Sequence, residues 1–413
     1  MVVLVVGVAT YRRAALAPAA LVLSDPFALS RYVGHTTLTT FKAALLGAFA
    51  ALVVRRALVV PRAGAPRAIA IVLALLVLAT ALTVPHAAMR TAAVRETFKA
   101  LEYAFAFLVA WWASRSDRDA PRLLGIACAC AIVLVALDAT RDFVSPQSGI
   151  WIGGRPVLRL AGHLEGPNQL AAWLGISLPI VVATAESWPL LIAALTLGAA
   201  ALALTLSRGG IAQALLSLAG AIWVRKVGGR RVVAVTALAA AVALGGLAFA
   251  ERSEGALLHV TSTTSSLDQG GTGSRAILWH AALAMARAHP LLGVGAGGFE
   301  FALPRYGAPP RVRTQANSLY LEALADGGVV LLAATLAAAL VPPLVLLRTG
   351  RRSVVPFTIG IAGLALAAHG IIDDVTFYTK VGQLWWLVAG TGAAAAELAS
   401  KSDSVPSTAP VAR

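Results

Sequence analysis

Long apolar segments recur along almost the whole of this chain, and they constrain its fold more than any other feature. Hydrophobic residues make up 58% of the 413 positions and charged residues 13%, whereas soluble domains are roughly 45–50% apolar and about 25% charged. A helix needs about 20 mostly apolar residues to cross a bilayer. Such segments lie near residues 38–54, 68–84, 98–114, 122–138, 169–185, 187–206, 209–224, 232–250, 329–347, 354–372 and 381–397.

A weaker apolar segment lies within residues 1–23, where Tyr11, Arg12 and Arg13 interrupt it. Together, these segments predict an all-α polytopic membrane protein with about twelve transmembrane helices.

Short basic loops predict the orientation of the chain. The loops at 55–67, 114–122, 225–231 and 348–353 are strongly basic and fall on one side when the spans alternate. Because Lys and Arg concentrate in cytoplasmic loops, that side and both termini are expected to be cytoplasmic. The outward side then carries substantial loops at 85–97, 139–168 and 251–328, of which the last is by far the longest.

This alternation divides the chain into four regions. We expect an N-terminal transmembrane bundle at 1–250, a large outward loop at 251–328, C-terminal transmembrane helices at 329–397 and a disordered cytoplasmic tail at 398–413. In the large loop, residues 275–289 have a helical period, with Ser274 as N-cap and Pro290 at the end. The Arg and His residues of this segment predict a helix at the membrane surface, over a cavity.

The outward side carries arginines that the positive-inside rule does not explain. Guanidinium groups stay charged and bind phosphate oxygens bidentately, so the set favours an anionic, phosphate-bearing, lipid-linked ligand. For any one of them, pairing with lipid headgroups or nearby acids is the alternative. Because the arginines are scattered between apolar segments, the net charge of +15 predicts no nucleic-acid partner. The set comprises Arg90, Arg95, Arg141, Arg155, Arg159, Arg208, Arg252, Arg275, Arg287, Arg305, Arg311 and Arg313.

Arg208 is the most informative of these arginines. The stretch "LTLSRGG" places it between two apolar segments with almost no loop between them. An arginine at membrane depth is costly unless it faces the bundle interior or a water-filled cavity. We therefore expect Arg208 and Arg275 to line one outward-open cavity.

Two polar clusters lie at expected outward helix ends. The stretch "RLAGHLEGPNQL" (159–170) contains Arg159, Glu165 and Asn168, although capping and interfacial snorkelling explain it equally well. In "AHGIIDD", His369 and Asp373 lie four residues apart, a spacing that suits a hydrogen-bonded pair on one helix face.

No motif points to a metal or a cofactor. The His and carboxylate residues do not form a metal-ligand pattern. The stretch "GVGAGGF" (293–299) lacks the strand–turn–helix setting of a nucleotide-binding loop.

Amide side chains gather at the mouth of an apolar helix in "RVRTQANSLYLEALADGG" (311–328). Polar groups at a membrane edge are tolerated best beside a water-filled pocket. We therefore expect Gln315 and Asn317 to face the same cavity as Arg208, while a capped helix start with solvated amides is the alternative.

Five motifs, which occur in the family's order and are quoted at the end of this paragraph, resemble those of the O-antigen ligase and O-antigen polymerase superfamily of membrane glycosyltransferases. The resemblance implies a GT-C-like bundle with one large periplasmic loop in the bacterial inner membrane. It also implies an undecaprenyl-diphosphate-linked glycan donor, a glycan or lipid acceptor, and no metal or nucleotide. By position, Arg159, Arg208 and Arg275 would hold the diphosphate. The motifs are "RLAGHLEGPNQLA", "LTLSRGG", "TGSRAILWHAALAMARAHPLLGVGAGGF", "NSLYLEALADGG" and "HGIIDD".

The chain departs from the ligase pattern at one position. Ligases of the family read His-Ala-His-Asn-x-Tyr-Leu-Glu at this junction, with the second histidine as the proposed base, and here that position is Asn317. An amide can orient a hydroxyl but cannot take its proton. Glu322 and Glu165 are the candidate bases, while Gln315, His369 and Asp373 are candidate substrate-binding residues. The departure favours a polymerase-type member, or a broader role in surface-polysaccharide synthesis, over a ligase.

A transporter of an anion or a lipid-linked glycan is the alternative function. The same arginines would serve a transporter, but such proteins often show paired halves with interrupted helices. No such symmetry is evident here, and one large loop on one side suits an enzyme.

Overall fold

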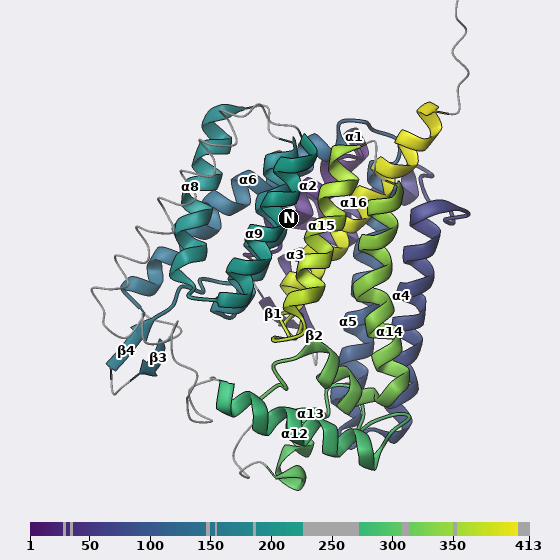
Figure 1. The fold of residues 1–413 in the computed structure, drawn as a ribbon. Helices are drawn as coiled ribbons and strands as arrows, with labels where there is room; N and C mark the ends of the chain where they lie inside the picture. The colour runs from purple at the N-terminus through teal and green to yellow at the C-terminus, as the bar shows by residue number, and fades with distance from the viewer. Residues whose placement is uncertain are drawn as a thin grey trace, which may run out of the picture.

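The computed structural model describes residues 1–27, 30–33, 36–145, 149–152, 155–184, 187–225, 272–307, 314–349 and 353–403. Within these ranges the chain is a helical bundle, and it is an all-α membrane protein apart from two short hairpins (Figure 1). Three described helices are long and apolar enough to cross a membrane, at Gly64–His86, Ala120–Phe143 and Leu319–Thr349. The full set of about twelve spans stays a prediction, and the segment 232–250 lies outside the described residues.

The helices follow the apolar segments closely because each run of apolar residues buries one face against its neighbours. Helix α5 starts at Arg90, well before residue 98. The helices are α3 (Thr40–Val54), α4 (Gly64–Thr83), α5 (Arg90–Ser114), α6 (Ala120–Ala139), α7 (Pro167–Thr184), α8 (Trp188–Leu204), α9 (Arg208–Arg225), α15 (Val354–His369) and α16 (Thr379–Asp403).

The expected first span is divided into α1 (Val2–Arg12) and α2 (Leu16–Ser24). Arg13 lies between them and pairs with Asp117 at 2.8 Å and Asp119 at 2.6 Å, in the loop between α5 and α6. The chain turns where this charge finds its partners, so one continuous helix over residues 1–23 does not form.

Two antiparallel hairpins were not predicted. Strand β1 (Ser30–Val33) pairs with β2 (Thr36–Thr39), with Ser30 opposite Thr39. Strand β3 (Gly149–Ile152) pairs with β4 (Arg155–Leu158), with Gly149 opposite Leu158. Each strand is only four residues long and lies within an expected loop or at its edge. It is too short to show a clear alternation of apolar and polar residues.

Glycine lets the central helices approach closely. A Cβ atom at Gly390 of α16 would lie 2.5 Å from the carbonyl oxygen of Phe107 in α5. A Cβ at Gly382 would lie 2.3 Å from the ring of Tyr103. Small residues at helix contacts are the common solution in membrane bundles, and here they join α5 to α16.

The lower end of the bundle is crossed by α12 (Thr272–Ala288) (Figure 1). A helix therefore forms over the predicted segment 275–289, although it begins two residues before the expected N-cap Ser274; its place at the membrane surface stays a prediction. The short helices are η1 (Val84–His86), η2 (Thr140–Phe143), α13 (Phe299–Ala302) and η4 (Leu303–Tyr306). The rest of the large loop, at 251–271 and 308–313, lies outside the described residues, as do Arg252, Arg311 and Arg313.

Helix α14 (Leu319–Thr349) begins ten residues before the expected span at 329 and is kinked at Gly327 and Gly328. Gly328 has φ 60°, and a Cβ there would lie 2.4 Å from the carbonyl oxygen of Leu291. The backbone N–H of Val329 donates to Pro290 at 2.9 Å. The kink thus allows the backbone of the turn at Pro290 and Leu291 to pack directly against α14.

The C-terminal boundary also differs from the expected one at 397. Helix α16 continues to Asp403, where Lys401 pairs with Glu397 at 2.7 Å. Residues 404–413 of the expected tail lie outside the described residues.

Candidate functional site

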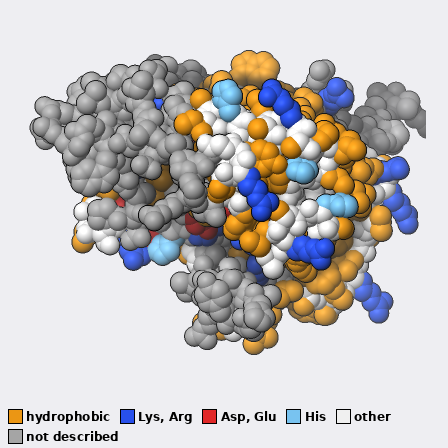
Figure 2. Space-filling model, turned by 90° about the horizontal axis from the view of Figure 1, so that it is seen from below, with side chains coloured by type: hydrophobic (Ala, Val, Ile, Leu, Met, Phe, Trp, Pro, Cys, Tyr) orange, Lys and Arg blue, Asp and Glu red, His pale blue; other side chains and the backbone are white. Residues whose placement is uncertain are grey.

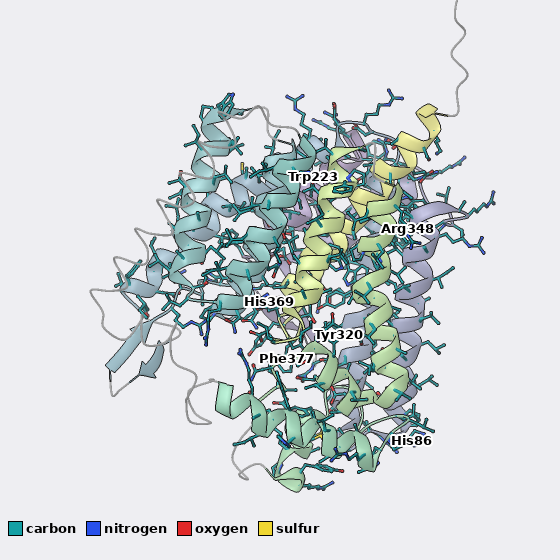
Figure 3. The ribbon with its side chains drawn as sticks, in the orientation of Figure 1. His86, Trp223, Tyr320, Arg348, His369 and Phe377 are labelled. Atoms are coloured by element: carbon teal, nitrogen blue, oxygen red, sulfur yellow. The ribbon has the colours of Figure 1, made fainter. Side chains whose placement is uncertain are left out.

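Segments far apart in sequence meet where α15 ends. The backbone N–H of Leu319, at the start of α14, donates to the carbonyl of Gly370 at 2.9 Å. The hydroxyl of Tyr320 donates to the carbonyl of Ala367 at 2.7 Å. Figure 3 shows His369, Tyr320 and Phe377 near one another, while Trp223 and Arg348 lie toward the other end of the bundle.

Arg159 and its hydrogen-bond partners connect three segments of the chain. Its Nε donates to the carbonyl of Thr205 at 2.7 Å, and a terminal nitrogen donates to Asn168 Oδ1 at 2.8 Å. The amide of Asn168 then donates through Nδ2 to Asp373. Because both ends of the Asn168 amide are used, its orientation is fixed. The loop before α7, the turn before α9 and the loop after α15 are therefore linked.

Arg159, Arg208 and Arg275 interact electrostatically. Burial lowers the pKa of Arg159 to about 10; the negative charge of Asp373 opposes this, and the positive charges of Arg275 and Arg208 add to it. Arg159 still carries its charge at neutral pH. Positions 159, 208 and 275 thus contribute positive charge to one place, while a shared outward-open cavity and a bound diphosphate stay predictions.

Asp373 is buried among these cations. Burial raises its pKa to about 6, against the lowering effect of the charges on Arg275 and Arg159. Its Oδ2 accepts the hydrogen bond from Asn168. Its Oδ1 is buried and makes no hydrogen bond within the described part of the chain, and the same holds for the Nε of Arg275.

His369 has a different partner from the one expected. Its Nδ1 lies 2.8 Å from Gln213 Oε1, while Gln213 Nε2 donates to the carbonyl of Ala172 at 3.1 Å. Helix α15 ends at His369, so the four-residue spacing to Asp373 no longer corresponds to one helix face. The expected side-chain pair of His369 with Asp373 is therefore wrong. A Cβ at Gly209 would lie 2.6 Å from the His369 ring, which places the residue after Arg208 against it.

The amide-bearing loop before α14 is held at Ala316. The indole of Trp279 in α12 donates to the Ala316 carbonyl at 3.1 Å, and the Ala316 N–H donates to Glu322 at 2.7 Å. The neighbours of Ala316 are the two predicted amides. Asn317 has φ 51°, and the Gln315 Oε1 is buried and makes no hydrogen bond among the described residues.

Both candidate bases are occupied. Glu322 is buried and holds the loop through the Ala316 N–H. Glu165 forms an ion pair with Lys380 at 3.4 Å; burial raises its pKa, and Lys380 opposes that effect. In this geometry each of these carboxylates fixes a loop.

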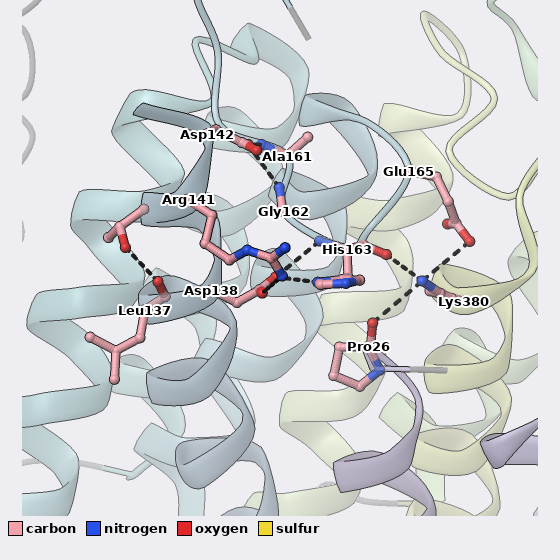
Figure 4. Close-up of polar contacts among 11 residues, drawn as sticks. Pro26, Leu137, Asp138, Arg141, Asp142, Ala161, Gly162, His163, Glu165 and Lys380 are labelled. Carbon is pink, nitrogen blue, oxygen red and sulfur yellow. Dashed lines mark hydrogen bonds and ion pairs between the residues drawn. The ribbon is translucent and has the colours of Figure 1, made fainter. Parts of the chain in front are cut away.

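Lys380 and two aspartates hold the loop that carries Arg159 (Figure 4). Lys380 donates to the carbonyl of His163 and, at 3.3 Å, to that of Pro26. Asp138 accepts from the His163 ring at 2.7 Å, and Asp142 accepts from the Ala161 N–H at 2.8 Å. These contacts were not predicted from the sequence. The only signals were a lysine and several acids at the ends of apolar segments.

A second polar region lies behind the loop that follows α15. It is a cavity of about 170 Å³ between α4, α5, α14, α15 and α16. Its charged lining residues are Glu96, Lys99, Glu322, Asp326 and Asp374. We call it the acid-lined cavity, and the cluster of Arg159, Arg208, Arg275 and Asp373 the guanidinium site.

The face below α12 is shown in Figure 2, where His, Lys and Arg side chains are interspersed among hydrophobic ones. A cavity of about 510 Å³ at this end is lined by His86, His289, Arg305 and Tyr306, among others. This cavity includes neither the guanidinium site nor the amide loop.

Residues 193–336 match the family model described as O-antigen ligase. The match runs from within α8 to within α14, so it includes Arg208, Arg275 and Asn317, while Arg159 and Asp373 lie outside it. No curated protein matches the chain.

Proposed function

We propose that this chain, whose residues 193–336 match the family model described as O-antigen ligase, is a glycosyltransferase of surface-polysaccharide biosynthesis. It moves a glycan from an undecaprenyl-diphosphate donor to an acceptor hydroxyl at the periplasmic face of the bacterial inner membrane. The acceptor is a second glycan or a lipid-borne glycan.

The grouping of three guanidiniums from distant positions is the observation that carries this proposal. A diphosphate presents several anionic oxygens, and guanidiniums bind such groups bidentately without losing charge. Arg159 responds to the charges of both Arg208 and Arg275. A diphosphate bound among them would offset their mutual repulsion.

In the proposed reaction the acceptor oxygen attacks the anomeric carbon of the donor. The bond from the acceptor oxygen to that carbon forms as the bond from the carbon to the phosphate oxygen breaks. The lipid diphosphate leaves with the electron pair, and the arginines stabilise its growing negative charge. The positive charge therefore comes from the protein, and the reaction is proposed to be metal-independent.

The amide loop supports placing the acceptor beside the guanidinium site. Ala316 is fixed by Trp279 of α12 and Glu322 of α14, so the flanking Gln315 and Asn317 are on a rigid segment. The unpartnered Oε1 of Gln315 can accept a sugar hydroxyl. Because Asn317 stands where ligases carry a histidine, we favour a polymerase, whose acceptor is another lipid-linked repeat, over a ligase acting on lipid A core.

The proposed orientation rests on the basic loops. Segments near residues 58–66, 115, 349 and 401 line one cavity at the end opposite α12 (Figure 1). Positive loops favour the cytoplasm, so α12 and the guanidinium site would face the periplasm and the end of α16 the cytoplasm. A cysteine-accessibility assay at Ser116 and Arg287 tests this assignment.

Transfer by the purified protein tests the proposed activity. In liposomes with a radiolabelled lipid-diphosphate oligosaccharide, we expect a longer lipid-linked product. Arg208→Ala should reduce its formation by about 10²-fold or more, whereas Arg287→Ala, at an exposed site on α12, should leave it unchanged. Movement of the labelled lipid across the bilayer without product would instead identify a transporter.

A further inference from the structure

A glycosyl acceptor must lose its hydroxyl proton, and the residue that takes this proton is not evident from the family pattern. Asn317 cannot take it. Glu322 accepts the Ala316 N–H at 2.7 Å, and Glu165 pairs with Lys380 at 3.4 Å. Both carboxylates already hold loops in place.

We infer that Asp373 is the general base that takes the proton from the acceptor hydroxyl, an inference that rests on the proposed glycosyl transfer. One oxygen of its carboxylate is fixed by Asn168, and the other is buried without a hydrogen bond in the described part of the chain. The carboxylate thus has one oxygen for positioning and one for a ligand.

A second unpaired atom at the same site supports this assignment. The Nε of Arg275 is also buried without a hydrogen bond within the described residues, and the charge of Arg275 acts on both Asp373 and His369. Buried polar atoms are nearly always paired. Two such open atoms at one site are explained if each meets part of the substrate. The N–H of Arg275 Nε would bind a phosphate oxygen of the glycan donor, and Asp373 Oδ1 would bind the hydroxyl of the glycan acceptor.

The charges around Asp373 suit a base that strengthens when substrate binds. Arg275 and Arg159 face it with positive charge, Asp374 adds negative charge, and His369 ends the preceding helix. Burial raises its pKa to about 6, so at neutral pH the carboxylate is ionised and can accept a proton. A bound diphosphate would neutralise the guanidiniums and thereby raise the proton affinity of Asp373 further.

The proton balance follows directly. The acceptor O–H bond breaks and its proton moves to Asp373 Oδ1, while the acceptor oxygen forms its bond to the anomeric carbon. The electron pair of the broken carbon–oxygen bond leaves with the lipid diphosphate. Asp373 then releases the proton to water.

The test compares Asp373→Asn with Asp374→Asn in proteoliposomes containing the lipid-diphosphate oligosaccharide. Asn keeps an oxygen that can accept from Asn168, so the loop stays fixed. We expect Asp373→Asn to lower turnover by about 10²–10⁴-fold. Its affinity for the labelled donor, measured separately by binding, should be unchanged or higher because a negative charge near the diphosphate is gone.

Asp374 is the matched control because it is buried next to Asp373 but bonds to Thr376 N and Oγ1 at 3.1 and 2.9 Å. Asp374→Asn should change turnover by less than about tenfold, the scale of one hydrogen bond. The pH profile is a second measurement. Wild-type kcat/KM should fall as pH drops through about 6, where Asp373 becomes protonated, and Asp373→Asn should lose this dependence.

The outcomes separate the two proposals. Donor binding without transfer by the wild-type protein at any pH would overturn the proposed function and, with it, the base. Transfer by the wild type, together with full turnover by Asp373→Asn, would overturn the base alone. An equal loss of donor affinity and turnover in Asp373→Asn would make Asp373 a binding residue and also overturn the inference.

Discussion

The acid-lined cavity and the guanidinium site lie on either side of the loop after α15, and both bury charged side chains. In the acid-lined cavity the carboxylates are used: Asp326 accepts the N–H groups of Gly297 and Phe299 at 2.6 and 2.8 Å. In the guanidinium site, Arg275 Nε and Asp373 Oδ1 make no hydrogen bond among the described residues. Buried charge alone therefore does not indicate function; an unsatisfied buried group is the better signal.

The largest expected effect is a loss of stability on changing the acid-lined cavity. Asp326→Ala should lower the free energy of unfolding by roughly 2–6 kcal/mol, because one buried and one partly buried N–H group lose their acceptor at about 1–3 kcal/mol each. Thermal unfolding of the detergent-solubilised protein measures this effect. Asp119→Ala, which removes an exposed partner of Arg13, should cost less than about 1 kcal/mol. An Asp326→Ala protein as stable as wild type would end the distinction between the two regions.

The next effect concerns activity without stability. Arg275→Ala should reduce glycosyl transfer by about 10²–10³-fold, equivalent to roughly 3–4 kcal/mol of transition-state stabilisation, while thermal unfolding stays close to wild type. Arg275→Lys keeps the charge but loses the fork of donors, so it should recover only part of the rate. Full activity in Arg275→Lys would show that a point charge suffices and that bidentate binding is unnecessary.

The sequence predicted most helix positions because runs of about 20 apolar residues have few alternatives to a spanning helix. It predicted a helix after the amides of residues 311–328 but counted the apolar span only from residue 329, because Glu322 and Asp326 interrupt the apolar pattern in the first part of α14. It also found the arginines but not Gln213 or Lys380. Their hydrogen-bond partners lie 41 to 354 positions away in the sequence. Only the folded structure brings residues so far apart in sequence into contact.

The His369–Asp373 pair shows why spacing is an incomplete guide. Four residues correspond to one helix face only while the helix continues, and here it ends at His369. The sequence also did not distinguish the roles of the carboxylates. Glu322, Glu165 and Asp373 looked alike until their partners were known.

A third prediction concerns the effect of the Asp373 charge on stability. Asp373 is destabilising when ionised, because its pKa in the folded protein, about 6, lies above its usual value near 3.9. Stability is therefore lost as pH rises through this interval and stays lower above it. Asp373→Asn should raise the free energy of unfolding at neutral pH by about 1–3 kcal/mol, whereas at pH 4 the gain should largely disappear. Equal destabilisation by Asp373→Asn and Asp326→Ala would place both carboxylates in the structural class.

The smallest expected effect is a loss of turnover on changing the amide loop, which shares features of the acid-lined cavity and of the guanidinium site. Its backbone is satisfied at Ala316 by Trp279 and Glu322, while the Gln315 Oε1 remains open within the described chain. If Asn317 orients the acceptor without taking its proton, Asn317→Ala should lower turnover by about tenfold, or about 1–2 kcal/mol. Steady-state transfer measures this effect, and the wild-type donor affinity should persist.

Asn317→His sharpens the same comparison because it restores the ligase-type residue. If Asp373 already serves as the base, the added imidazole should preserve or modestly raise transfer in the wild-type background. In the Asp373→Asn background it should restore part of the lost rate, since histidine titrates near neutral pH and can take the proton itself. Complete loss of transfer in Asn317→Ala, with thermal unfolding unchanged, would instead give Asn317 more than an orienting role. An unchanged rate in that variant would place the acceptor away from the amide loop, and the unpaired Asp373 oxygen would then have to meet the acceptor from the α7 and α9 side.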